Sequence, residues 1–179
     1  MVVDRPSGAG RLCAAIAGMA VLLAFVPACT GPGSRFKGVA PADEHASAVY
    51  VYRPESAAGG AYIPNVLIDG REQAGLSNGG FLRRALLPGL HIIELRSPPG
   101  MNPPKPVKLP FEAKRGRIHF IRYRIGPAAN AIAAHPAVTP GVAAVSDSGF
   151  THTVDLVEEA AAVRELARTR AVESQHRSR

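Results

Sequence analysis

Short runs of β-branched and aromatic residues, separated by Gly, Pro, Asn and Asp, fill much of the chain between residues 48 and 157 and predict β-strands. In one run, Ile93 and Leu95 alternate with Glu94 and Arg96, as in a strand with one buried face. Pro110 removes a backbone donor from its run and therefore predicts an edge strand. Strands are predicted at residues 48–53, 65–68, 81–86, 90–95, 107–112, 117–125 and 151–157.

The segments between and after these runs predict turns, one long loop and one helix. Asp69-Gly70 and Ser77-Asn78-Gly79-Gly80 are turn sequences. Residues 126–149 are rich in Ala, Pro and Gly without periodicity, so we expect a long surface loop. Helical spacing predicts a helix over about residues 158–171. Its buried side would carry Leu156, Ala160, Val163 and Ala167. The fold class is therefore mainly β: a small antiparallel, Ig-like β-sandwich of about seven strands with a C-terminal helix.

The N-terminus has the organisation of an export signal. Arg5 and Arg11 precede an uncharged, mostly apolar run at residues 12–26. A helix of that length rises about 22 Å, less than the hydrocarbon core of about 30 Å, which favours a signal peptide. Val26-Pro27-Ala28-Cys29 follows and resembles the bacterial lipobox, in which the Cys receives a diacylglyceryl group. The resemblance implies cleavage before Cys29 and a lipoprotein signal peptide at residues 1–28.

Acyl chains on Cys29 would hold the protein on a membrane. Residues 30–47 are rich in Gly, Pro, Ala and Ser, so 29–47 is predicted to be a flexible tether. Thr30 after the Cys, by resemblance to proteobacterial sorting rules, favours an outer-membrane lipoprotein that faces the periplasm. The alternative is an uncleaved, single-pass membrane protein that keeps residues 1–28.

The charge pattern points to anionic partners outside the cytoplasm. The formal net charge is +7, and residues 48–125 hold nine Arg and three Lys against five acids. Export argues against nucleic acid, so lipid headgroups or acidic envelope polymers are the better electrostatic partners, while a solvated cationic surface without a partner is the interpretation that the charge alone favours. If their strands are neighbours, a set of arginines would form a basic, anion-binding face. The candidates are Arg83, Arg84, Arg96, Arg117, Arg122 and Arg124.

Catalytic and metal sites receive little support from the sequence. Gly75-Leu76-Ser77-Asn78-Gly79 matches the nucleophile-elbow pattern, but two glycines and a strand pattern follow Ser77 where an elbow needs a helix. A serine esterase on Ser77 is kept as an alternative. The six histidines lack metal-ligand spacing. His91 and His119 could meet, and we expect buried, hydrogen-bonded imidazoles there rather than a shared ligand site. No cofactor motif is present.

A family resemblance accompanies these patterns. The order AVYVYRPES, PNVLIDGREQAGLSNGGFLRRALLPGLHIIEL, RGRIHFIRYRIG and VDLVEEAAAVREL is similar to an uncharacterised family of bacterial lipoproteins, domain of unknown function family 2846. Residues 88–95 also resemble, more weakly, PEGA-type β-sandwich modules. The resemblance covers roughly residues 48–167 and implies a small β-sandwich, an envelope location and no known activity. The strand and helix patterns place the β-sandwich at residues 48–157 and the C-terminal helix and frayed tail at 158–179. We therefore expect a lipid-anchored, non-enzymatic protein with an unknown envelope partner.

Overall fold

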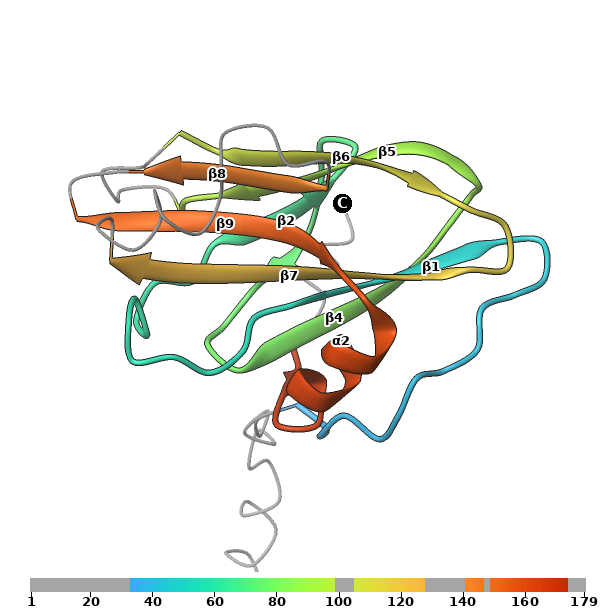
Figure 1. The fold of residues 1–179 in the computed structure, drawn as a ribbon, viewed down its shortest axis with the longest axis horizontal. Helices are drawn as coiled ribbons and strands as arrows, with labels where there is room; N and C mark the ends of the chain where they lie inside the picture. Colours follow the sequence, from blue (N-terminus) through green and yellow to red (C-terminus); the bar gives the residue numbers. More distant parts are fainter. Residues whose placement is uncertain (1–32, 99–104, 128–140, 147–148, 174–179) are drawn as a thin grey trace, which may run out of the picture. The chain divides into compact units, whose positions relative to one another are not determined.

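The computed structural model describes residues 33–98, 105–127, 141–146 and 149–173 (Figure 1). In this part of the chain, ten strands form two sheets, and one helix follows the ninth strand. The mainly β fold with a C-terminal helix is therefore confirmed. The elements are β1 Ser47–Tyr52, β2 Asn65–Ile68, β3 Arg71–Gly75, β4 Gly80–Leu86, β5 Gly89–Arg96, β6 Val107–Ala113, β7 Ile118–Pro127, β8 Val142–Ser146, β9 Phe150–Val157, α2 Glu159–Leu166 and β10 Arg170–Ala171.

The larger sheet has the strand order β10-β4-β1-β7-β9-β8. Its pairing is not wholly antiparallel as predicted, because β1 lies parallel to β7 and β10 parallel to β4. Between β1 and β7 the chain passes through the whole second sheet. That long crossover returns it to the end at which β1 began, which is what a parallel pair requires.

The smaller sheet has the order β3-β2-β5-β6 and is antiparallel throughout. The turn between β2 and β3 places Asp69 and Gly70 at φ values of 50° and 77°, the left-handed conformation of a tight hairpin turn. Strand β6 is at one edge of the sheet, so the missing N–H of Pro110 removes no inter-strand hydrogen bond on the side without a neighbouring strand. The edge-strand prediction is confirmed.

Alternating side chains of the larger sheet divide the core into two layers. Val49 and Val51 of β1 pack between the sheets with residues of β2, β5 and β6. Tyr50 and Tyr52 point to the other face, where Leu166 of α2 covers them. In Figure 1, α2 lies beside β4 and β1 on this outer face. The smaller sheet therefore covers one face of the larger sheet, and α2 covers part of the other.

Three strands are absent from the sequence-based prediction. Strand β3 has the sequence REQAG, which carries no β-branched or aromatic residue. It forms because the hairpin turn folds it back onto β2. Strand β8 lies inside the segment predicted to be a long loop, so that prediction is wrong for Val142–Ser146, which pairs with β9. Residues 128–140 lie outside the described part. Strand β10 is the end of the segment predicted to be helical.

The helix is shorter than predicted and turned about its axis. It covers Glu159–Leu166, and its buried residues are Ala162 and Leu166. Ala160 and Ala167, predicted to face inward, are exposed. The prediction placed Leu156 in phase with the helix, but Leu156 belongs to β9 and is itself 40% exposed. The true inward face also brings Glu165 toward the sheet.

Residues 33–46, predicted as part of the flexible tether, lie along the domain instead. The Phe36 ring makes edge contacts with Tyr50 and Phe81, with ring centroids 6.0 and 5.7 Å apart. The Phe36 backbone N–H donates to the carbonyl of Thr169. In Figure 1 this blue segment runs from beside α2 to the start of β1. Burial of an aromatic side chain and these backbone bonds hold the segment in place.

Candidate functional site

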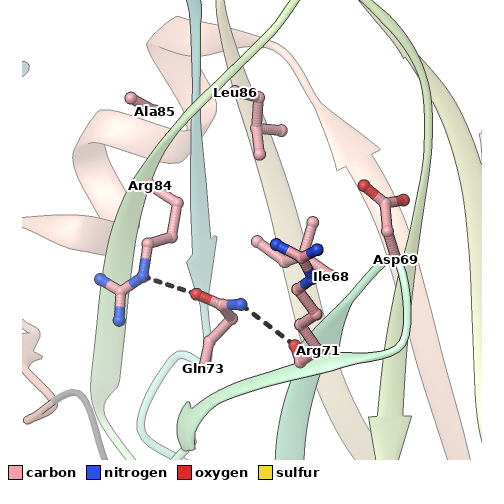
Figure 2. A pocket seen from close by; sticks show the side chains of 7 residues that line it. All are labelled: Ile68, Asp69, Arg71, Gln73, Arg84, Ala85 and Leu86. Carbon is pink, nitrogen blue, oxygen red and sulfur yellow. Dashed lines mark hydrogen bonds between the residues drawn. The ribbon is translucent and has the colours of Figure 1, made fainter. Parts of the chain in front are cut away.

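A pocket of about 440 Å³ opens at one side of the sandwich, where β3 and β4 belong to different sheets. Strand β10 pairs only with Gly80 and Phe81, so the rest of β4 has no neighbour on that side among the described strands. Strand β3 is the edge of the smaller sheet. The lining residues, drawn in Figure 2, are Ile68, Asp69, Arg71, Gln73, Arg84, Ala85 and Leu86.

Arg84 reaches the pocket from the larger sheet. It pairs with Val49 of the core layer, so its side chain is directed between the sheets. Its Nε donates to Gln73 Oε1 at 2.9 Å and its Nη1 donates to the Arg83 carbonyl at 2.9 Å. Gln73 in turn donates to the Arg71 carbonyl at 3.0 Å. The arginine is thus oriented by two bonds, and its Nη2 makes no hydrogen bond within the described residues.

Arg71 reaches the same pocket from the smaller sheet. It pairs with Ile68, whose side chain is part of the core between the sheets. Its guanidinium makes no hydrogen bond or ion pair in the described part of the chain. Figure 2 shows Arg71 and Arg84 on different strands with Gln73 between them. The pocket therefore has two guanidinium groups with donors that the protein does not use.

The one acid of the pocket already has a partner. Asp69 Oδ2 lies 2.6 Å from Nδ1 of His91, and its Oδ1 accepts from the Ile92 N–H at 2.9 Å. Slight burial raises the pKa of Asp69, but the Ile92 N–H, His91 and Arg71 outweigh it, and this pKa lies below its usual value. Asp69 therefore bonds His91 directly, and the charge of Arg71 acts on it without a hydrogen bond or ion pair in the described residues.

His91 is placed between two acceptors. Its Nε2 lies 2.8 Å from the Leu87 carbonyl, while Nδ1 faces Asp69. Only the protonated ring can donate to both. Desolvation lowers the pKa of His91, but the bonds to Asp69 and Leu87 and the charge of Asp69 raise it above the usual value. The hydrogen bonding predicted for this imidazole is confirmed, but the ring is partly exposed rather than buried.

His91 and His119 do not form a shared ligand site. The Phe111 ring lies between them, with its centroid 6.1 Å from that of His91 and 5.4 Å from that of His119. His119 Nε2 accepts from the Lys114 N–H. Desolvation, aided by the charge of Lys114, lowers the pKa of His119. Among the described residues, no group of three metal-ligating side chains comes together.

Arg122, predicted to belong to a basic face, forms ion pairs with two acids of the protein instead. Its Nη2 lies 2.7 Å from Asp155 Oδ2 and its Nη1 lies 2.6 Å from Glu165 Oε1. Glu165 also accepts from the Tyr52 hydroxyl at 2.7 Å. Desolvation lowers the pKa of Arg122, but the hydrogen bonds and charges of Asp155 and Glu165 have the larger effect, so the pKa of Arg122 lies above its usual value. The pKa of Tyr52 is also raised, first by burial and then by Glu165. Arg122 therefore joins β7, β9 and α2.

The other predicted arginines are spread over the molecule. Arg124 shares the outer face with Arg122 and lies 3.8 Å from Asp155. Arg83 donates to the Pro41 carbonyl and lies over the Tyr50 ring. Arg96 pairs with Glu94 on the smaller sheet, and Arg117 is exposed at the turn before β7. The six arginines are not brought together on one face, because their strands belong to two sheets and their side chains alternate between faces.

Ser77 lies in a turn between two strands. Strand β3 ends at Gly75 and β4 begins at Gly80, and the Gly80 N–H donates to the Ser77 carbonyl at 3.0 Å. The Asn78 side chain bonds both backbone groups of Ser56. An elbow has a helix after the serine, whereas here the next element is a strand. The arrangement is that of a structural turn fixed to the neighbouring loop.

The lipidation site, Cys29, and the apolar run before it lie outside the described residues. Within the described part, the structure contains no helix with the length and hydrophobicity needed to span a bilayer.

The family profile described as Protein of unknown function (DUF2846) matches residues 43–137. The chain belongs to this family. The DUF2846 match includes β1 to β7 and all seven residues that line the pocket, but not Cys29 or α2. No curated protein and no solved structure matches the chain, so the weaker resemblance to PEGA modules stays a prediction.

Sequence reasoning missed most of this pocket. Arg84 was among the predicted anion-binding residues, but Arg71, Gln73 and Asp69 were not. The signal for Arg71 was its place directly after the Asp69-Gly70 turn, because a two-residue hairpin sets Arg71 opposite Ile68. What the sequence could not show is that β3 would lie across an opening from β4.

Proposed function

We propose that this DUF2846 protein is a lipid-anchored, non-enzymatic binding protein of the cell envelope, outer-membrane and facing the periplasm. The apolar run at residues 12–26, followed by Val26-Pro27-Ala28-Cys29, supports the anchor. The β-sandwich supports a binding role, since the polar groups around Arg122 and Asn78 bond one another, whereas the pocket arginines keep unused donors. The observation that carries the binding role is the pair Arg71 and Arg84, which face one opening with unused donors.

The pocket fits an anionic group. Guanidinium groups recognise carboxylates and phosphates through paired N–H donors, and they lose little hydration on binding. Asp69 has His91 as its direct partner and forms no ion pair with either arginine among the described residues, so the guanidinium donors stay available. Ile68 and Leu86 supply an apolar wall. A pocket of about 440 Å³ is large enough for one acidic saccharide or phosphate unit, so an acidic envelope polymer is the proposed ligand class.

Intact-mass measurement of the membrane-extracted protein tests the anchor. The expected result is loss of residues 1–28 together with the added mass of the lipid on Cys29. A Cys29→Ser variant should leave the membrane fraction. An unprocessed chain that remains membrane-bound would instead support the single-pass alternative.

Thermal unfolding in the presence of glucuronate and, separately, inorganic phosphate tests the pocket. A ligand that binds only the folded state raises the unfolding temperature in proportion to its occupancy. The rise should be present in the parent protein, lost in Arg71→Gln, and kept in Arg115→Gln, which removes the same charge from an exposed turn. An equal rise in all three proteins would show nonspecific ion binding and would contradict the pocket assignment.

The esterase alternative has a direct test of its own. A fluorophosphonate probe should leave Ser77 unmodified, because its turn offers no strand-to-helix elbow. Labelling that disappears in Ser77→Ala would overturn the non-enzymatic assignment.

A further inference from the structure

Four exposed cations gather where the described chain begins. Residues 33–37 run beside β10, and Arg35 and Arg170 form a β-bridge. The Ala171 N–H donates to the Ser34 carbonyl at 2.9 Å, which fixes this pairing. Phe36 points inward to the aromatic cluster, so its neighbours in sequence point outward. We name this surface the basic ridge; it consists of Arg35, Lys37, Arg168 and Arg170.

The basic ridge lacks counter-charges within the protein. Like charges placed opposite each other on paired strands are destabilising, yet Arg35 and Arg170 occupy such a pair. Neither side chain, nor that of Lys37 or Arg168, takes part in a hydrogen bond or ion pair in the part of the chain that the structure describes. Of the two acids nearest to them in sequence, Glu165 is bonded to Arg122 and Tyr52, and Glu173 is not paired with them there. Such a ridge is suited to anions from outside the molecule.

The length of chain before the ridge identifies the source of those anions. Only residues 30–32 separate Cys29 from Gly33. A fully extended chain advances at most about 3.6 Å per residue, so Gly33 lies within roughly 14 Å of the Cys29 backbone. An acyl group on Cys29 would therefore keep the surface around Gly33 beside the lipid headgroups. The Gly33 backbone itself touches Ala171 of β10, since a Cβ there would meet the Ala171 carbonyl oxygen.

We propose that the basic ridge is the surface through which this protein rests on an anionic bilayer. This inference rests on the proposed lipid anchor at Cys29. The anchor supplies permanent attachment, and the ridge supplies orientation. Each cation near an anionic surface favours the orientation with the ridge against the bilayer roughly fivefold at low salt.

The orientation has a consequence for the pocket. Arg170 pairs with Gly80 at the beginning of β4, whereas the pocket is lined by Arg84, Ala85 and Leu86 at the other end of that strand. Six residues of strand separate these ends, or roughly 20 Å. The docked protein therefore holds its pocket away from its own membrane, and the pocket's ligand is a group that approaches from the periplasm rather than a headgroup of the anchoring leaflet.

Energy transfer from a labelled protein to a lipid-bound acceptor tests this orientation. The mature lipoprotein would have no free thiol, since cleavage removes Cys13 and acylation occupies Cys29. A donor dye is attached to Ser34→Cys beside the ridge or to Leu90→Cys, an exposed residue at the beginning of β5, just beyond the far end of β4. The lipidated full-length protein is reconstituted in phosphatidylcholine vesicles with or without phosphatidylglycerol. Transfer should be high for Ser34→Cys and low for Leu90→Cys in the anionic vesicles.

Four controls make the test specific. The difference in energy transfer between the two labelled proteins, which we call the contrast, should become smaller in neutral vesicles. It should also become smaller at about 0.5 M NaCl, where charges are screened within a few ångströms. Arg35→Gln, Arg168→Gln and Arg170→Gln together should lower the docking equilibrium about 100-fold if the cations act independently. The matched variant Lys114→Gln, Arg115→Gln and Arg117→Gln removes the same charge from the opposite end and should keep the contrast.

The outcomes separate the anchor from the ridge. Intact mass of the same sample reports the lipid, and its absence would overturn both proposals. If the protein is lipidated but the difference in energy transfer between the two labels does not depend on anionic lipid, only the ridge proposal would be overturned. The ridge would also be overturned if the matched variant lost the contrast as fully as the ridge variant does.

Discussion

The outer face of the larger sheet and the pocket at the sandwich edge use arginine in opposite ways. On the outer face, Arg122 is 18% exposed and bonded to both Asp155 and Glu165. In the pocket, Arg84 is held by a neutral glutamine and a carbonyl, and Arg71 by no hydrogen bond in the described residues. The residue type is the same, but only the pocket keeps donors available. An arginine therefore indicates a binding site only after its partners within the protein have been counted.

Replacing Arg122 should have the largest effect on stability. Arg122→Ala leaves the buried Asp155 with only the longer 3.8 Å contact to Arg124 and leaves the partly buried Glu165 without its cation, which costs about 3–5 kcal/mol of the free energy of unfolding. Urea unfolding measures this loss. Arg124→Ala, on the same face but 43% exposed, should cost less than about 1 kcal/mol. Similar costs for the two variants would contradict the structural role assigned to Arg122.

Arg84 should have an intermediate effect. Arg84→Ala removes the bond that connects β4 to Gln73 of the other sheet and the bond to the Arg83 carbonyl. The expected loss is about 1–2 kcal/mol, the usual range for hydrogen bonds of charged groups at partly exposed sites. Urea unfolding of Gln73→Ala and of the double variant completes a mutant cycle, in which the two losses should not add. Full additivity would show that the two side chains act independently.

The Asp69–His91 pair predicts a pH dependence of stability. The pKa of His91 is raised above 6.5, so its contribution is complete below that pH and is lost as pH rises through the raised pKa. The pKa of Asp69 is lowered below 3.8, so its contribution is present above that pH and is lost as pH falls through the lowered value. The effect should be at most about 1 kcal/mol, because Asp69 is half exposed and screened by solvent.

The unfolding temperatures of the parent and of His91→Gln, measured from acidic pH to above neutrality, test whether the Asp69–His91 pair stabilises the fold. The parent should lose stability relative to the variant as pH rises above neutrality. Parallel curves for the two proteins would show that His91 keeps an ordinary pKa in the folded state.

Arg71 should matter least for folding and most for binding. Arg71→Ala removes a side chain without a hydrogen-bond partner among the described residues, so the free energy of unfolding should change by less than about 0.5 kcal/mol. The same variant should lose the response to glucuronate and phosphate. A stability loss as large as that of Arg84→Ala would mean that Arg71 serves the fold, and the contrast between the two regions would then weaken.

Local features of the fold were predictable because they depend on neighbouring residues. Asp69-Gly70 predicts a hairpin turn since both positions tolerate positive φ, and Pro110 predicts an edge strand since it lacks an N–H. The alternation of Ile93 and Leu95 with Glu94 predicts a strand with one buried face; the strand is present as β5, but Glu94 on its other face is buried as well. Strand β3 was missed because REQAG has no strand signal of its own, and its conformation depends on the pairing with β2.

The amino-acid sequence alone determined the β class, the tight turns and the predicted export and lipidation signal, because each of these is a property of a short stretch of chain. The tertiary structure decided that β1 and β7 run parallel, that Arg122 is enclosed by acids, and that Arg71 and Arg84 face one opening. These outcomes depend on which distant strands pair and in which register. A shift of one residue would turn every side chain of a strand to its other face, and no local pattern specifies that choice.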